Sequence, residues 1–271
     1  MNVLILTDFS NVAENAGKYA VNFLENVPVN FYLLNIQTYN FRGCTDTCIE
    51  EKRNAALEKL NNCITKLNNS SSNPSHTFTP LFSEDNLVIT TRKYVAEKKI
   101  SLIVMGAAGR DMQYNALLGN HTYDIIRKIK CTVLAVPEGS VFREIGKIIL
   151  PINFSAALDD RIFNFFETPG ICLRRNVTVM EIIDSGHLVA NPEIPRQLLS
   201  SQLHKNNVKF IEIQETAVYD QILLTEIQKN YDMIVILGKN LSVCERLLHT
   251  KYGIVTAISN ELPVLVLHGH R

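Results

Sequence analysis

The sequence predicts an α/β protein made of two tandem copies of one unit, each a five-stranded parallel sheet covered by helices. The first observation is that short, almost continuous apolar runs such as Leu102–Met105 alternate with helical patterns, as in parallel sheets that are buried on both faces. The second is that the pattern begins again in the second half. There Lys147–Ser155 aligns with Asn2–Ser10, and both segments end in Phe-Ser.

Five strands are predicted in the first half, because each run is apolar, short and bounded by polar or turn-forming residues. They are Val3–Leu6, Val29–Ile36, Thr77–Ser83, Leu102–Met105 and Thr132–Val136.

Four helices connect these strands. Ser10 can cap the first helix, and Thr47 with Glu50 forms a capping box for the second. The third helix is Leu87–Lys98. The fourth has apolar residues with the spacing of one helix face, at Ile125, Ile126 and Ile129.

Glu138–Gly146 is the predicted linker, which divides the chain into units at residues 1–140 and 146–271. The second unit has further predicted strands at Val177–Ile183, Val208–Gln214, Met233–Gly238 and Pro263–Leu267, and helices around Gln197–His204 and Val218–Lys229.

The composition is that of a globular protein: of 271 residues, 46% are hydrophobic and 20% charged. Lys plus Arg and Asp plus Glu both number 27, so no overall field attracts nucleic acid or an anionic membrane. No apolar run approaches the length of a membrane span, and the first residues do not form a signal peptide. We therefore expect a cytoplasmic protein whose six cysteines are reduced.

The stretch from Met105 to Thr122 carries the strongest functional pattern. Gly106, Gly109 and Gly119 lie between a buried strand and a helix, and glycine lets a ligand approach the backbone closely. Asn120 is a suitable N-cap for that helix, whose first N–H groups can face an anion. These features together predict a phosphate-binding loop.

The spacing Gly106-x2-Gly109-x9-Gly119 resembles the nucleotide-binding signature of the universal stress protein family, in which Ser or Thr normally follows the last glycine. Asn120 occupies that place here, which alters the last polar contact. The internal repeat and the Thr-Asp-Phe-Ser end of the first strand strengthen the resemblance, which covers nearly the whole chain.

The resemblance implies two Rossmann-like units with the flavodoxin-like strand order 3-2-1-4-5, related by a pseudo-two-fold axis. It also implies that the fifth strands, Thr132–Val136 and Val264–Leu267, pair within one polypeptide as a pseudo-dimer, which covers two sheet edges. A further homodimer is left open.

Ligands of open α/β sheets bind beyond the carboxyl ends of the strands where the strand order reverses, here beside Asp8 and Gly106. The resemblance implies that Thr7 and Asp8 touch an adenine nucleotide, ATP, and that the backbone near Asn35 and Ile36 holds the adenine. The residues expected around the ribose and phosphates are Met105, Gly106, Gly109, Gly119, Asn120 and His121.

Asp8 has two interpretations, because a carboxylate beside phosphates needs a compensating charge. It can hold Mg²⁺, which binds few carboxylates and keeps much of its water, or it can cap a turn. The residues leave both open.

The second unit departs from the signature. Leu241 and Lys251 stand where the second and third glycines would be, and Asn153 replaces Asp8. Side chains at these positions would crowd the phosphate loop, so we expect one nucleotide site per chain.

Other motifs are weaker. Gly238-Lys239 resembles the end of a P-loop but lacks the upstream glycine and the Ser or Thr. Cys44-x3-Cys48 has only Cys63 nearby, which is too few ligands for a zinc site, and incidental thiols are favoured over a redox switch. His121 lacks a partnered nucleophile or a second base, so no catalytic residue is assigned.

Three functions remain. The first is a nucleotide-binding regulatory stress protein, not an enzyme, with a protein partner that the sequence does not identify. The second is a scaffold without nucleotide. The third is a slow ATPase, although neither a P-loop nor a Ser-Gly-Gly-x-Asp-Ser loop is present.

Overall fold

The computed structural model describes residues 1–37, 46–107, 120–154, 162–171, 175–183, 193–214, 226–227, 229–240 and 262–269. The strands are β1 Asn2–Leu6, β2 Asn30–Ile36, β3 Thr77–Ser83, β4 Leu102–Gly106, β5 Thr132–Val136, β6 Lys147–Ile152, β7 Asn176–Ile183, β8 Asn207–Gln214, β9 Met233–Leu237 and β10 Val264–Leu267. The α-helices are α1 Asn11–Phe23, α2 Asp46–Ser70, α3 Leu87–Glu97, α4 Asn120–Lys128 and α5 Glu193–Gln202. Short 3₁₀ turns are η1 Asn164–Glu167 and η3 Gly238–Asn240.

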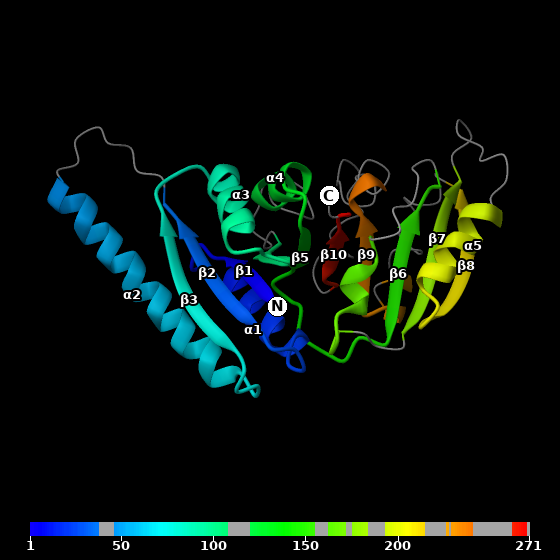
Figure 1. Ribbon diagram of the computed structural model, residues 1–271, viewed down its shortest axis with the longest axis horizontal. Coiled ribbons are helices and arrows are strands. Elements are labelled where there is room, and N and C mark those ends of the chain that lie inside the picture. Colours follow the sequence, from blue (N-terminus) through cyan, green and yellow to red (C-terminus); the bar gives the residue numbers. More distant parts are fainter. Residues whose placement is uncertain are drawn as a thin grey trace.

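The described strands form one ten-stranded sheet in the order β3-β2-β1-β4-β5-β10-β9-β6-β7-β8 (Figure 1). All neighbours are parallel except β5 and β10, which are antiparallel. The predicted α/β class is confirmed, and each half of the sheet has the order that the family resemblance implies.

Two of the predicted caps lie inside the helices that they were expected to precede. Ser10 caps α1 as expected, and its side chain accepts from the Ala13 N–H. However, α2 includes Asp46, so Thr47 and Glu50 lie inside the helix and are not the predicted capping box. Similarly, α4 includes Asn120 as its first residue, so Asn120 is not the residue that precedes the helix. Helix ends commonly shift by a residue in this way.

Two apolar cores cover the two faces of the sheet, because successive side chains of a strand point to opposite faces. Val3 and Ile5 of β1 pack toward α1 and α2, whereas Leu4 and Leu6 pack on the side of α3 and α4. Both cores continue into the second half, where α5 supplies Leu199 to the first of them.

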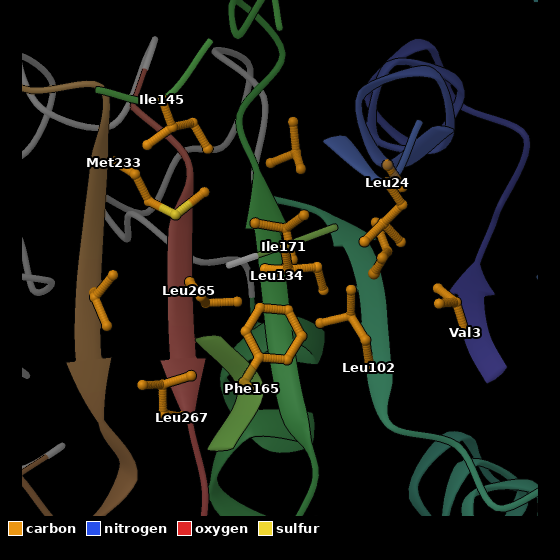
Figure 2. Close-up of a cluster of buried hydrophobic side chains, with 14 of the residues drawn as sticks. Val3, Leu24, Leu102, Leu134, Ile145, Phe165, Ile171, Met233, Leu265 and Leu267 are labelled. Carbon is orange, nitrogen blue, oxygen red and sulfur yellow. The ribbon is translucent and has the colours of Figure 1, made fainter. Parts of the chain in front are cut away.

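The junction between the halves is β5 paired with β10, with Val264, Leu265 and Val266 opposite Ala135, Leu134 and Val133. The predicted pairing of the fifth strands is therefore confirmed. In Figure 2, Phe165 and Ile171 from the second half lie against a cluster that includes Leu102, Leu134 and Leu265. No helix in the described part of the chain has the length and apolar character of a membrane span.

Candidate functional site

The strand order reverses at β1, which lies between β2 and β4. The register places Ile5 beside both Leu33 and Val104, so these three strands end at the same edge of the sheet. Beyond that edge the chain turns from β1 into α1 and, by way of Ala107, leaves β4. In open α/β sheets this is where ligands bind.

The turn after β1 is held by its own side chains. Thr7 Oγ1 accepts from the Phe9 N–H at 3.0 Å, and Asp8 Oδ1 accepts from the Ser10 N–H at 3.0 Å and from the Ser10 hydroxyl at 2.5 Å. Asp8 is exposed, and Phe9 has the left-handed φ of 68°. Asp8 therefore caps this turn in the structure, as the second of its two interpretations proposed.

Asn35 lies beside this turn and is only 2% exposed. Its Nδ2 donates to the Thr7 carbonyl at 2.7 Å, which fixes the orientation of the amide. Its Oδ1 is buried and has no hydrogen-bond partner in the described part of the chain. Leaving such an acceptor unsatisfied costs about 1–3 kcal/mol, so this atom requires an explanation.

Gly106 ends β4 directly under the first turn of α1. A Cβ there would lie 2.6 Å from Val12 Cγ1 and 3.0 Å from the Val12 carbonyl carbon. The Gly106 carbonyl accepts from Thr122 Oγ1 of α4 at 3.1 Å. Helix packing thus requires this glycine, in addition to any approach by a ligand.

The remaining predicted site residues are distributed as follows. Ile36 is half-buried at the end of β2, and His121 is exposed in the first turn of α4. The Met105 side chain packs in the core on the α4 side, so only its backbone borders the edge. Gly109 and Gly119 lie outside the described residues, as does the side chain of Asn120.

Metal binding has no support beyond Asp8. Within the described ranges, no group of three or more His, Cys, Asp or Glu side chains is arranged to hold a metal ion. Of the cysteines, Cys63 and Cys131 are described and free, and burial raises the pKa of both thiols, that of Cys131 to about 12. Cys44 and the side chain of Cys48 lie outside the described part.

The corresponding edge of the second half is organised differently. A Cβ on Gly238 would lie 2.4 Å from Cε1 and Nδ1 of His268, so the imidazole lies directly against the glycine at the end of β9. Leu241 and Lys251 fall outside the described residues. The sequence did not single out His268, although it follows β10 as Pro137 follows β5.

Glu181 is a second residue that sequence reasoning missed. β2 begins at Asn30 and β7 begins at Asn176, so Glu181 lies at the position in β7 that corresponds to Asn35 in β2. Its carboxylate is 4% exposed and accepts from Arg196 Nε of α5 at 2.9 Å. The hydrogen-bonding capacity that is unmet at Asn35 is met here from within the chain.

Comparison with known proteins gives a family and a fold. The model of the universal stress protein family matches residues 1–137. No curated protein matches the chain. A universal stress protein from Archaeoglobus fulgidus DSM 4304 is similar in structure, with a TM-score of 0.69, 16% identity, and coverage of 98% of this chain and 97% of that one. A functionally unknown protein from Pseudomonas aeruginosa PAO1 has a TM-score of 0.55 at 15% identity, with 99% and 92% covered.

Proposed function

Because this chain belongs to the universal stress protein family, we propose that it binds one adenine nucleotide, ATP, in a first unit of residues 1–140. The unit of residues 146–271 binds none. The protein acts as a regulatory module in the stress response and not as an enzyme. A cytoplasmic location belongs to this proposal, since the ligand is an intracellular nucleotide.

The observation that carries the proposal is the meeting of Thr7, Asn35 and Gly106 at one sheet edge, where the strand order reverses. Thr7 directly follows β1, Asn35 lies in β2 and Gly106 ends β4, and the other two glycines of the sequence pattern follow Gly106. The family model ends at residue 137 and so covers this half of the chain.

The chemistry required is binding and orientation. The N–H groups at the start of α4 face an anion favourably, and the glycine loop before α4 adds further backbone donors. Asp8 either holds Mg²⁺ beside the phosphates or continues to cap its turn. No step of bond cleavage is assigned to these residues.

The sequences of the two halves support a single site. Leu241 and Lys251 stand where the second and third glycines of the signature would be, and Asn153 stands in the place of Asp8. Gly106 and Gly238 do not separate the halves, because a side chain fills the Cβ position at both, Val12 at 2.6 Å and His268 at 2.4 Å.

The direct test is to heat the purified protein, analyse released small molecules, and titrate it with ATP and Mg²⁺ by calorimetry. We expect an adenine nucleotide or a stoichiometry near one per chain. ATP at about 100 times its Kd raises the free energy of unfolding by about 2.7 kcal/mol.

Two variants form a matched pair for this test. Gly109→Val removes the binding because it fills the loop, whereas Leu241→Val, at the corresponding place in the second half, leaves it unchanged. Absence of released nucleotide together with a melting temperature that does not respond to millimolar ATP would refute the proposal.

One alternative is a scaffold that has lost nucleotide binding, and Asn120 in place of Ser or Thr favours it. The absence of released nucleotide and of any response of the melting temperature to ATP would support this alternative. A slow ATPase would instead release phosphate above background, and this activity would be abolished in Gly109→Val and reduced in Asp8→Ala.

A further inference from the structure

The buried amide oxygen of Asn35 is the feature of the candidate site that the fold does not use. Asn35 is 2% exposed, and its Nδ2 is committed to the Thr7 carbonyl at 2.7 Å. An amide flip would bring two oxygens together, so the orientation is determined by that carbonyl. Oδ1 therefore remains an acceptor, and no donor in the described part of the chain reaches it.

In the second half, where no nucleotide is proposed to bind, the corresponding buried acceptor has a hydrogen-bond donor from the chain itself. Glu181, at the same step of β7, is 4% exposed, and Arg196 of α5 donates to its carboxylate at 2.9 Å. Arg196 also contacts Glu212 and Glu193, so the acceptor is held in a network within the chain. The two halves thus differ in whether this acceptor has an internal donor.

We infer that the Asn35 carboxamide reads the base of the bound nucleotide, with Oδ1 accepting a hydrogen bond from the exocyclic amine of adenine. This inference rests on the proposed function and extends it, because the family resemblance implies backbone contacts to the base and not a side chain that selects it.

The selection follows from donor and acceptor chemistry. Nδ2 donates one hydrogen to the Thr7 carbonyl, and Oδ1 is the atom of the carboxamide that still needs a partner, so it calls for a ligand that donates a hydrogen bond. Adenine presents an amine at that edge, whereas hypoxanthine presents a carbonyl, which would place two acceptors together. A site built around a hydrogen bond rejects a ligand that cannot make it. A ribose hydroxyl is the other donor of a nucleotide, and the experiment must separate the two.

The experiment is calorimetric titration of the full chain with ATP, ITP and 2′-deoxyATP. We expect ATP to bind at least about tenfold more tightly than ITP, with 2′-deoxyATP close to ATP. Equal affinity for ATP and ITP would overturn the inference and leave the proposed function standing. A loss confined to 2′-deoxyATP would assign the acceptor to the ribose and would also overturn it. Absence of binding by all three would overturn both.

Variants assign the effect to the side chain. Asn35→Ala should lower the preference for ATP over ITP toward one. Glu181→Gln, the matched change in the second half, should leave the preference unaltered. If Asn35→Ala weakens ATP and ITP binding equally, the carboxamide only positions Thr7 and the inference fails. Melting temperatures measured without nucleotide show whether each variant folds. If a variant does not fold, the ratio of the ATP and ITP affinities of the wild-type protein decides whether the inference holds.

Discussion

At the scale of single residues, the edge of the first half shows how the fold uses the positions that were predicted to bind a ligand. Asn35 holds the Thr7 carbonyl with one end of its amide and leaves the other end unsatisfied. Asp8 caps its own turn, and Gly106 makes room for Val12. The residues that the sequence singled out here therefore have structural roles as well.

The first prediction concerns Gly106. In Gly106→Ala the new Cβ would meet Val12 of α1 at 2.6 Å, and overpacking of this kind costs about 1–3 kcal/mol. Urea unfolding measures the loss. Gly146→Ala is the control, because its Cβ would meet only Asp232 Oδ2 at an ordinary 3.7 Å, and it should change stability by less than about 0.5 kcal/mol. Equal losses in the two variants would contradict the packing argument.

The second prediction concerns Glu14 in the first turn of α1. Hydrogen bonds from Lys18 and then Lys66, at 2.8 and 2.9 Å, lower the pKa of this carboxyl group, although partial desolvation opposes them. A lowered folded-state pKa contributes stability above the unfolded pKa, and this contribution is lost as the pH falls through the folded value.

Glu14→Gln should therefore lower the free energy of unfolding at pH 7 by up to about 1 kcal/mol, as for other partly exposed pairs, and the difference should disappear in acid. Urea unfolding at both pH values checks this. Glu58→Gln, an exposed change on α2 away from the described ion pairs, is the control. A difference that persists below both pKa values would point to packing instead of charge.

Residue-level prediction succeeded where the signal was local and failed where it was not. Ser10 is recognisable as a cap because a helix pattern follows it directly, and α1 confirms this. His268 and Arg196 have no such signal. Their contacts are with Gly238 and Glu181, which lie on other elements, and only the folded sheet brings them together. The positions of Gly109, Gly119 and the nucleotide contacts remain predictions.

At the scale of elements, the strands were predictable because buried parallel strands are apolar along their whole length. Thr77–Ser83 and Thr132–Val136 were predicted with the bounds that β3 and β5 have. Two helix caps were predicted wrongly, since Thr47 and Asn120 lie within α2 and α4. The sequence also gave no indication that residues 162–171 would pack on α1.

The third prediction tests that packing. Phe165 of η1 stacks on Phe23 of α1 with ring centroids 6.5 Å apart and planes 18° apart, and it is 9% exposed. Phe165→Ala should lower the free energy of unfolding by about 3 kcal/mol. A double-mutant cycle with Phe23→Ala should give a coupling energy of about 0.5–1.5 kcal/mol. Strict additivity would mean that the two rings do not stabilise each other across the halves.

At the scale of the whole molecule, one sheet and two cores run through both halves. Leu134 of β5 and Leu265 of β10 are opposite each other and belong to the same cluster (Figure 2). The family resemblance implied this pairing, which covers the edge strand of each unit. What the resemblance did not imply is the difference between Asn35 and Glu181 at the corresponding edges of the two halves.

The fourth prediction concerns the strand edge that β5 would expose without β10. In a chain of residues 1–140 alone, β5 would lose β10 and become an exposed strand, although all five of its residues are buried in the full chain. Such an edge pairs with other chains, so we expect concentration-dependent association in sedimentation experiments. The full-length chain at the same concentrations is the control. A fragment that stays monomeric throughout would show that β10 is not needed to cover the edge.

The antiparallel union of β5 and β10 has one more consequence, which concerns dilution. Partners joined by a short tether meet at an effective concentration that the tether sets, whatever the amount of protein in solution. Only the segment from Pro137 to Gly146 separates β5 from β6, so the companion half is always at hand. Pairing within one chain is therefore favoured over pairing between chains as long as the protein is well below that effective concentration, and dilution to nanomolar levels does not separate the two halves of the sheet.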